Sequence, residues 1–174
     1  MEIVRFGHKS VELEDCVIVS KNFSGATVKH NGKIMNNEGV RNFLLLLPPD
    51  IAQELEERSW RVKYFAPKEE GDEPQAFMKV NVSYRQTPPV VHYISDGVDT
   101  HLGENRVHML DDVNIEMLDM RLSAFSRQDD DGVWRKSAFL DELWATVTPD
   151  RFAAKYANLR SSEDAALPFT MGEE

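Results

Sequence analysis

Cysteine is nearly absent from this chain of 174 residues. Its one cysteine, Cys16, excludes an intramolecular disulfide and any cysteine-based zinc site. Because Cys16 lies in an apolar run that continues to Val19, we interpret it as a buried structural thiol and not as a nucleophile. The chain also lacks an apolar run of the roughly 18 to 20 residues that a membrane-spanning helix needs, and its N-terminus has no signal-peptide pattern. We therefore expect a cytoplasmic protein without membrane contact.

Motifs for catalysis and metal binding are missing as well. The five histidines show no ligand spacing, and there is no glycine-rich phosphate loop and no Ser-His-Asp or Cys-His arrangement. The run Asp129–Asp131 lacks the spacing of a calcium loop and is typical of a solvated turn. Asp111, Asp112 and Asp119 could imitate a two-metal nuclease, but no companion lysine motif accompanies them. We predict no enzyme activity, no cofactor and no metal, with a metal-dependent nuclease as the enzymatic alternative.

A basic overall charge is absent too, because the formal net charge is -10. That charge argues against a protein that coats duplex DNA, but it leaves room for a local binding groove. Residues 58–68 contain cations and aromatic rings without any acid, and residues 75–95 contain no Asp or Glu. The acidic run 69–73 separates the two segments and argues against a single site. Cations beside flat rings suit a single nucleic-acid strand, whose phosphates need positive charge and whose bases need a surface to stack on.

Hydrophobic patterning predicts a protein that is mainly β with minor α. We expect strands at 2–6, 11–19, 40–47, 61–65, 77–85, 90–94, 113–126 and 133–147, and a polar hairpin at 26–37 around Asn31-Gly32. Residues 96–104 are expected to form an acidic hairpin loop, and the phase slip near Met117-Leu118 predicts a β-bulge. Short helices are expected after Pro48-Pro49 and from Thr148. This pattern favours an OB-like small antiparallel barrel at 1–159 with a flexible acidic tail at 160–174, and a β-sandwich is the alternative.

Four groups of side chains are candidates for binding a strand. The alternatives are that Trp60 and Phe65 are core, that the cations are solvated, and that Arg41 belongs to buried structure. Three aspartates at the tip of the last hairpin would also repel phosphate. The candidates are Trp60, Arg61, Lys63 and Phe65; Phe77, Lys79 and Arg85; Arg127, Trp134, Arg135 and Lys136; and Lys21, Lys29, Lys33 and Arg41.

The sequence resembles the OB-fold single-stranded DNA-binding proteins of phages and mobile elements. The matching stretches are residues 21–25 (KNFSG), 39–43 (GVRNF), 71–75 (GDEPQ) and 144–147 (WATV), and the resemblance covers roughly residues 15–157. It implies non-specific binding of single-stranded DNA during replication or recombination, in the host cytoplasm if a phage encodes the chain. The matching residues are structural, so the resemblance assigns no individual contact residue.

The C-terminal tail is similar to the acidic tail of bacterial single-stranded DNA-binding proteins, which ends in Pro-Phe and binds partner proteins. The corresponding residues are Glu163, Asp164, Pro168 and Phe169, followed by five more residues that include Glu173 and Glu174. Phe169 therefore lacks the terminal carboxylate of that motif. Two roles stay open: the tail binds replication or recombination proteins, or it occupies the basic groove until nucleic acid displaces it.

Two classes of function are thus predicted ahead of an enzyme, and the first of them is the leading hypothesis. The first is a sequence-non-specific single-stranded DNA-binding protein that uses a basic groove and aromatic stacking. The second is an acidic protein-interaction module, or a phage accessory or inhibitor protein, that does not bind nucleic acid. The sequence leaves open a homo-oligomer and the preference between DNA and RNA.

Overall fold

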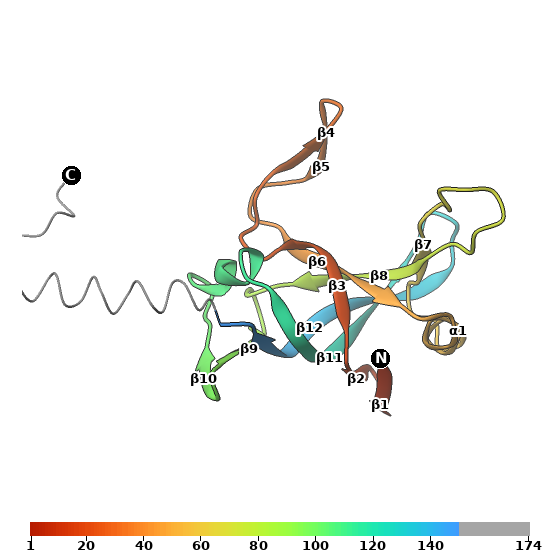
Figure 1. Ribbon diagram of the computed structural model, residues 1–174. Helices are drawn as coiled ribbons and strands as arrows, with labels where there is room; N and C mark the ends of the chain where they lie inside the picture. The colour runs from red at the N-terminus through yellow and green to blue at the C-terminus, as the bar shows by residue number, and fades with distance from the viewer. Residues whose placement is uncertain (150–174) are drawn as a thin grey trace, which may run out of the picture.

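Strands dominate residues 1–149, the part of the chain that the computed structural model describes (Figure 1). The longest strands are β11 (Ile115–Gln128) and β12 (Trp134–Val147). Within these residues, helical structure comprises α1 (Pro49–Glu57) and the 3-10 turn η1 (Val107–Asp111). The remaining strands are β1 (Glu2–Phe6), β2 (Ser10–Glu14), β3 (Val17–Asn22), β4 (Val28–His30), β5 (Lys33–Asn36), β6 (Arg41–Leu47), β7 (Lys63–Tyr64), β8 (Ala76–Val82), β9 (Val90–Ser95) and β10 (Val98–His101).

The main sheet closes into a barrel because one bent strand pairs at both of its ends. The strand order is β1-β2-β11-β12-β8-β6-β3. β2 and β3 are halves of one strand, bent where Asp15 has a φ of 54°. β2 pairs with β11, β3 pairs with β6, and the Cys16 N–H donates to the Leu118 carbonyl at 2.7 Å. The predicted OB-like barrel is therefore confirmed: β2–β3, β6, β8, β12 and β11 are its five strands.

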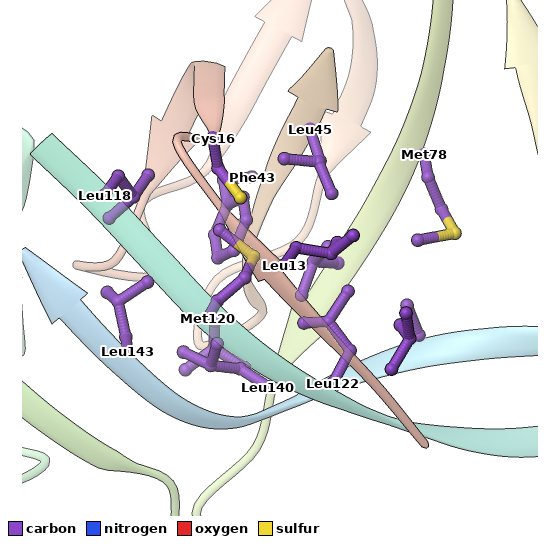
Figure 2. Close-up of a cluster of buried hydrophobic side chains, with 14 of the residues drawn as sticks. Leu13, Cys16, Phe43, Leu45, Met78, Leu118, Met120, Leu122, Leu140 and Leu143 are labelled. Carbon is purple, nitrogen blue, oxygen red and sulfur yellow. The ribbon is translucent and has the colours of Figure 1, made fainter. Parts of the chain in front are cut away.

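The alternation of β8 decides which of its side chains fill the barrel. Met78, Val80 and Val82 are buried, whereas Lys79 is exposed and Phe77 is half-buried. This is the predicted parity of a strand with one face on the core. Burying an aliphatic side chain stabilises the fold by about 1.5–3 kcal/mol, so the inward positions fix the register of the sheet. Figure 2 shows such buried side chains converging from several strands, among them Leu13, Phe43, Leu45, Met120 and Leu122.

The predicted polar hairpin is the β4–β5 pair, which stands away from the barrel (Figure 1). Its turn has positive φ at Asn31 (51°) and at Gly32 (78°). Two left-handed residues are what a two-residue turn needs to match the twist of its strands, and Asn-Gly adopts them readily. The hairpin connects the first and second strands of the barrel.

Helix α1 begins as predicted, with Pro49 at its first position and Asp50 in its first turn. It buries Ile51, Ala52 and Leu55 against the barrel, while its glutamates face solvent. In the order of the chain, the helix comes between the second and third strands of the barrel, β6 and β8. It therefore carries the chain from β6 to the short strand β7, which pairs with β8.

Several predicted boundaries were wrong. The 11–19 segment is two strands because of the bend at Asp15, and β8 ends at Val82, which places Arg85 in the loop that follows. The 61–65 strand is only Lys63–Tyr64. The 96–104 segment does lie in a hairpin, but its loop is shorter than predicted, because the tight turn at Asp96-Gly97 leads into β10, which pairs with β9.

The predicted bulge in the long strand is present. The β11–β12 register shifts between Ile115 and Met117, and again between Arg121 and Leu122. The helix expected from Thr148 falls almost wholly outside the described residues. Among residues 1–149, no helix has the length and apolar character to cross a membrane.

Candidate nucleic-acid interface

The outer face of the barrel collects outward side chains from β6, β8, β11 and the first half of β12. Strand register decides which residues share it. Asn81 of β8 lies opposite Asn42 on one side and opposite Phe139 on the other, and Lys79 lies opposite Leu44. Side chains from strands far apart in the sequence therefore form one continuous outer face.

Two of the predicted rings meet on this outer face. Phe65 and Phe77 stack with ring centroids 4.1 Å apart and planes inclined by 20°. Lys63 is the direct register partner of Phe77, and Lys79 is two residues further along β8, so both cations share the face of the rings. Phe65 remains 39% exposed. The structure thus brings together four of the predicted residues as an accessible aromatic pair between two lysines.

A second aromatic pair on this face was not among the predicted residues. Phe125 of β11 and Phe139 of β12 pack edge to face, with centroids 6.3 Å apart and planes inclined by 77°. Phe125 is 64% exposed. The sequence did contain a signal for it, because the apolar residues Leu122 and Ala124 share one parity of the strand, which leaves Phe125 on the opposite one. Phe139 shares the outer face because it lies opposite Asn81.

Two hollows flank the Phe139 ring. One, of about 370 Å³, is lined by residues that include Arg85, Thr87 and Phe125. The other, of about 730 Å³, is lined by residues that include Asn81, Arg85 and Glu104. Phe139 and Arg85 line both hollows. The outer face is therefore grooved beside its exposed aromatic pair, with the predicted cation Arg85 between the two hollows.

Trp60 is a correction to the predicted set. Its side chain is 2% exposed and belongs to the core, with the Lys136 ammonium 5.8 Å from its ring centroid. A buried indole offers no open surface for a base. Trp60 instead anchors the segment after α1 to β12, because its neighbour Arg61 donates its backbone N–H to the Lys136 carbonyl at 3.0 Å.

Arg61 and Arg135 are also corrections, since both form ion pairs within the protein. Arg61 binds Asp129, and Arg135 binds Asp129 at 2.7 Å and Asp131 at 3.0 Å. The hydrogen bond from Arg135 is the main cause that holds the pKa of Asp129 below its usual range. The aspartates of the turn therefore neutralise these two arginines, which are not available to phosphate in this arrangement.

Two further predicted cations form hydrogen bonds within the protein. The Lys21 ammonium donates to the carbonyls of Leu110 and Val113 at 2.7 and 2.8 Å, so it fixes the end of η1 to the barrel. The Arg41 guanidinium donates to the Phe23 carbonyl at 3.1 Å and pairs with Glu104 at 3.4 Å. Both predicted phosphate contacts are therefore corrected to structural roles.

The other predicted cations lie at the surface but are not gathered at one point. Lys29 and Lys33 are exposed on the β4–β5 hairpin. Arg127 is exposed and lies opposite Arg135 in the β11–β12 hairpin, where Trp134 is 63% exposed. These residues occupy the connections between barrel strands one and two and between strands four and five, the two loops that OB-folds use for oligonucleotides.

The acidic run 69–73 lies in the exposed loop that joins β7 to β8. The backbone pairing of Phe65 with Gln75 places this loop beyond the ends of both strands. Its carboxylates therefore border one end of the outer face and do not interrupt it. The predicted tail residues Glu163, Asp164, Pro168, Phe169, Glu173 and Glu174 lie outside the described residues.

A model of the phage ssDNA-binding domain family matches residues 2–172. The chain is similar to the solved structure of the single-stranded DNA-binding protein from bacteriophage Enc34, with 11% identity and a TM-score of 0.48 over 83% of this chain and 84% of that one. A C-terminal truncation of the Enc34 protein gives the same identity and TM-score over 87% of its length. Comparison with curated protein sequences gave no match. The matched family consists of DNA-binding proteins and not of enzymes, and because its model spans nearly the whole sequence, this chain belongs to the phage single-stranded DNA-binding family.

Proposed function

We propose that the chain binds single-stranded DNA without sequence preference along the outer face of its barrel. The observation that carries the proposal is the pair of aromatic contacts, Phe65–Phe77 and Phe125–Phe139, on one face that also presents Lys79. Every base has a flat surface, so stacking on rings tolerates any sequence.

The path follows from the positions of the two ring pairs. A strand that stacks on Phe65–Phe77 would cross Lys79 and Asn81 of β8 before it reaches Phe139, which lies opposite Asn81. The β4–β5 hairpin and the 129–133 turn would then border the strand, as the corresponding loops do in OB-folds. Arg85 lines the hollows beside Phe139 and would meet phosphate there.

Charge on this path is sparse, and that sets the expected salt dependence. Arg61, Arg135 and Arg41 are paired with acids, so among residues 1–149 the exposed cations on or beside the outer face are Lys63, Lys79, Arg85 and Arg127. Lys29 and Lys33 lie further out on the β4–β5 hairpin. Each phosphate neutralised on a single strand contributes about -0.7 to the slope of log affinity against log salt, so four contacts give a slope of about -3. Stacking would supply much of the affinity at higher salt.

The test is a titration of fluorescein-labelled oligo-dT followed by anisotropy. We expect saturable binding with the salt slope given above, and about tenfold weaker binding for Phe125→Ala, since one base stack is worth about 1–3 kcal/mol. Met117→Ala is the matched control, because Met117 is exposed on the same strand but away from the ring pair. Absence of binding at low salt would overturn the proposal, as would equal losses in the two variants.

We further propose that the protein acts in DNA replication or recombination, in the host cytoplasm, with residues 1–159 as the binding domain. Residues 160–174 carry one cation and four acids, so they could compete with DNA for the outer face or bind a partner protein. Truncation after Leu159 should tighten oligo-dT binding several-fold at low salt if the tail competes. Weaker binding after truncation would rule out the competitor role and leave partner binding.

A further inference from the structure

A group of metal-ligating side chains lies on the β9–β10 hairpin. His92 of β9 and His101 of β10 are direct register partners, and Asp99 is two residues from His101 on the same face. His92 Nδ1 lies 2.8 Å from Asp99 Oδ2, and His101 Nε2 lies 3.8 Å from the same oxygen. One potential ligand atom from each of the three side chains lies within 4.8 Å of the others. The hairpin therefore points two imidazoles and a carboxylate at one position.

The other ring nitrogen of His92 has its own partner. His92 Nε2 lies 2.7 Å from Glu142 Oε2 on β12, and Arg121 binds the other oxygen of Glu142 at 3.1 Å. Trp144 stacks on the His92 ring, with centroids 5.2 Å apart and planes inclined by 5°. His92 is buried, so its orientation is fixed from three sides. A carboxylate on the far nitrogen is the usual support of a metal-binding histidine, because it sets the tautomer. The near nitrogen, Nδ1, could then bind a cation in place of its hydrogen bond to Asp99.

We propose that His92, Asp99 and His101 form a binding site for a divalent transition-metal ion, with zinc as the best fit. Two imidazoles and one carboxylate are ligands that Zn²⁺ accepts. With metal–ligand bonds of about 2.0–2.2 Å, tetrahedral ligand atoms lie roughly 3.3 Å apart, which falls between the 2.8 and 3.8 Å observed. Water would complete the coordination on the exposed side of Asp99 and His101.

A bound ion would tie β10 to β9, and β9 is held on the barrel by its parallel pairing with β12. The site would therefore stabilise an edge hairpin, independently of the DNA-binding face.

The test is isothermal titration of the chelator-treated full chain with ZnCl₂ at pH 7.5. We expect one Zn²⁺ per chain, and affinity at least tenfold weaker for His101→Ala and for Asp99→Asn. His101 is 65% exposed, so its removal should leave the fold intact, which circular dichroism of the metal-free variant would check. The matched control is His8→Ala, which removes an exposed histidine from the turn before β2 and should leave zinc binding unchanged.

A second readout uses cobalt, which gives visible absorption bands in four-coordinate sites. Co²⁺ should produce these bands with the unaltered chain and with His8→Ala, but not with His101→Ala. Glu142→Gln should weaken binding by about 10- to 100-fold through the loss of the supporting carboxylate. Failure to saturate at one ion per chain would overturn the proposal, and so would equal affinity in the unaltered chain and His101→Ala. In either case the carboxylates of Asp99 and Glu142 would serve only to hold the His92 ring in place.

Discussion

A ring or a cation can bind DNA only if its own protein leaves it available. Trp60 has the right chemistry and is buried, whereas Phe125 is 64% exposed and stands beside a groove. Among the cations, the Lys21 ammonium donates hydrogen bonds to two carbonyls near η1, whereas Lys79 points outward between two ring pairs. Availability therefore separates residues that residue type alone would group together.

Lys79→Ala should weaken oligo-dT binding and make the slope of log affinity against log salt shallower by about 0.7, the share of one phosphate contact. Lys9→Ala is the matched control, because Lys9 is an exposed cation in the turn between β1 and β2. Anisotropy titrations at several salt concentrations measure both slopes. If the two variants behave alike, Lys79 contributes only general charge.

Cys16 should resist alkylation in the folded protein. It is 8% exposed, and burial, reinforced by the nearby Asp119 charge, raises the pKa of its thiol to about 12. Almost no thiolate then exists at pH 8, and the thiolate is the reactive form. Mass spectrometry should show slow modification by iodoacetamide in buffer and rapid modification in urea. Rapid modification of the native chain would mean that the contact between β3 and β11 opens readily.

At the scale of the element, the turn between β11 and β12 controls the charge that the barrel presents. Asp129 accepts hydrogen bonds from Arg61 and Arg135, and Asp131 holds Arg135 as well. The turn thus converts two potential phosphate contacts into structural ion pairs. The neighbouring Asp130 is exposed and has no ion pair among the described residues.

Asp129→Asn should therefore tighten binding to oligo-dT several-fold at low salt, because it frees Arg61 and removes one of the two aspartates that hold Arg135. Asp130→Asn removes the same formal charge without releasing an arginine, so it should have a smaller effect. The two variants are compared by anisotropy at one salt concentration. Equal gains would show that the total charge of the turn matters and that its ion pairs do not.

Strand β6 contributes two large side chains to the barrel core. Phe43 and Leu45 are fully buried, and their strand pairs with β3 on one side and with β8 on the other. Leu45→Ala should lower the free energy of unfolding by about 2–5 kcal/mol through lost burial and the cavity that remains. Urea denaturation measures the change. The exposed Val40, just before β6, supplies the control: Val40→Ala should cost less than about 0.5 kcal/mol.

At the scale of the whole molecule, local patterns predicted the elements and long-range pairing decided the site. The alternation in β8, the Asn31-Gly32 turn and the Pro49 helix start were all readable from neighbouring residues. The ring pair of Phe125 and Phe139 depends on the β11–β12 register. The arginine–aspartate pairs likewise join positions as far apart as Arg61 and Asp129.

The same limit applies to the histidines. His92 and His101 show no ligand motif along the chain because a strand turn separates them, and Glu142 joins them only through the β9–β12 pairing. Sequence spacing reveals ligands on one helix or in one loop, but not ligands that strand pairing brings together. Register is set by the whole barrel, so these contacts needed the three-dimensional structure.

The central claim is that single-stranded DNA lies along the outer face, from Phe65–Phe77 across Lys79 to Phe125–Phe139. The most direct test is photo-crosslinking of an oligonucleotide that contains 5-bromodeoxyuridine, with the attachment sites mapped by mass spectrometry. We predict crosslinks to these phenylalanines, and excess unlabelled oligo-dT should suppress them. Each crosslink should disappear when its own phenylalanine is changed to alanine. Crosslinks confined to the β9–β10 hairpin or to α1, with none on the outer face, would contradict the account.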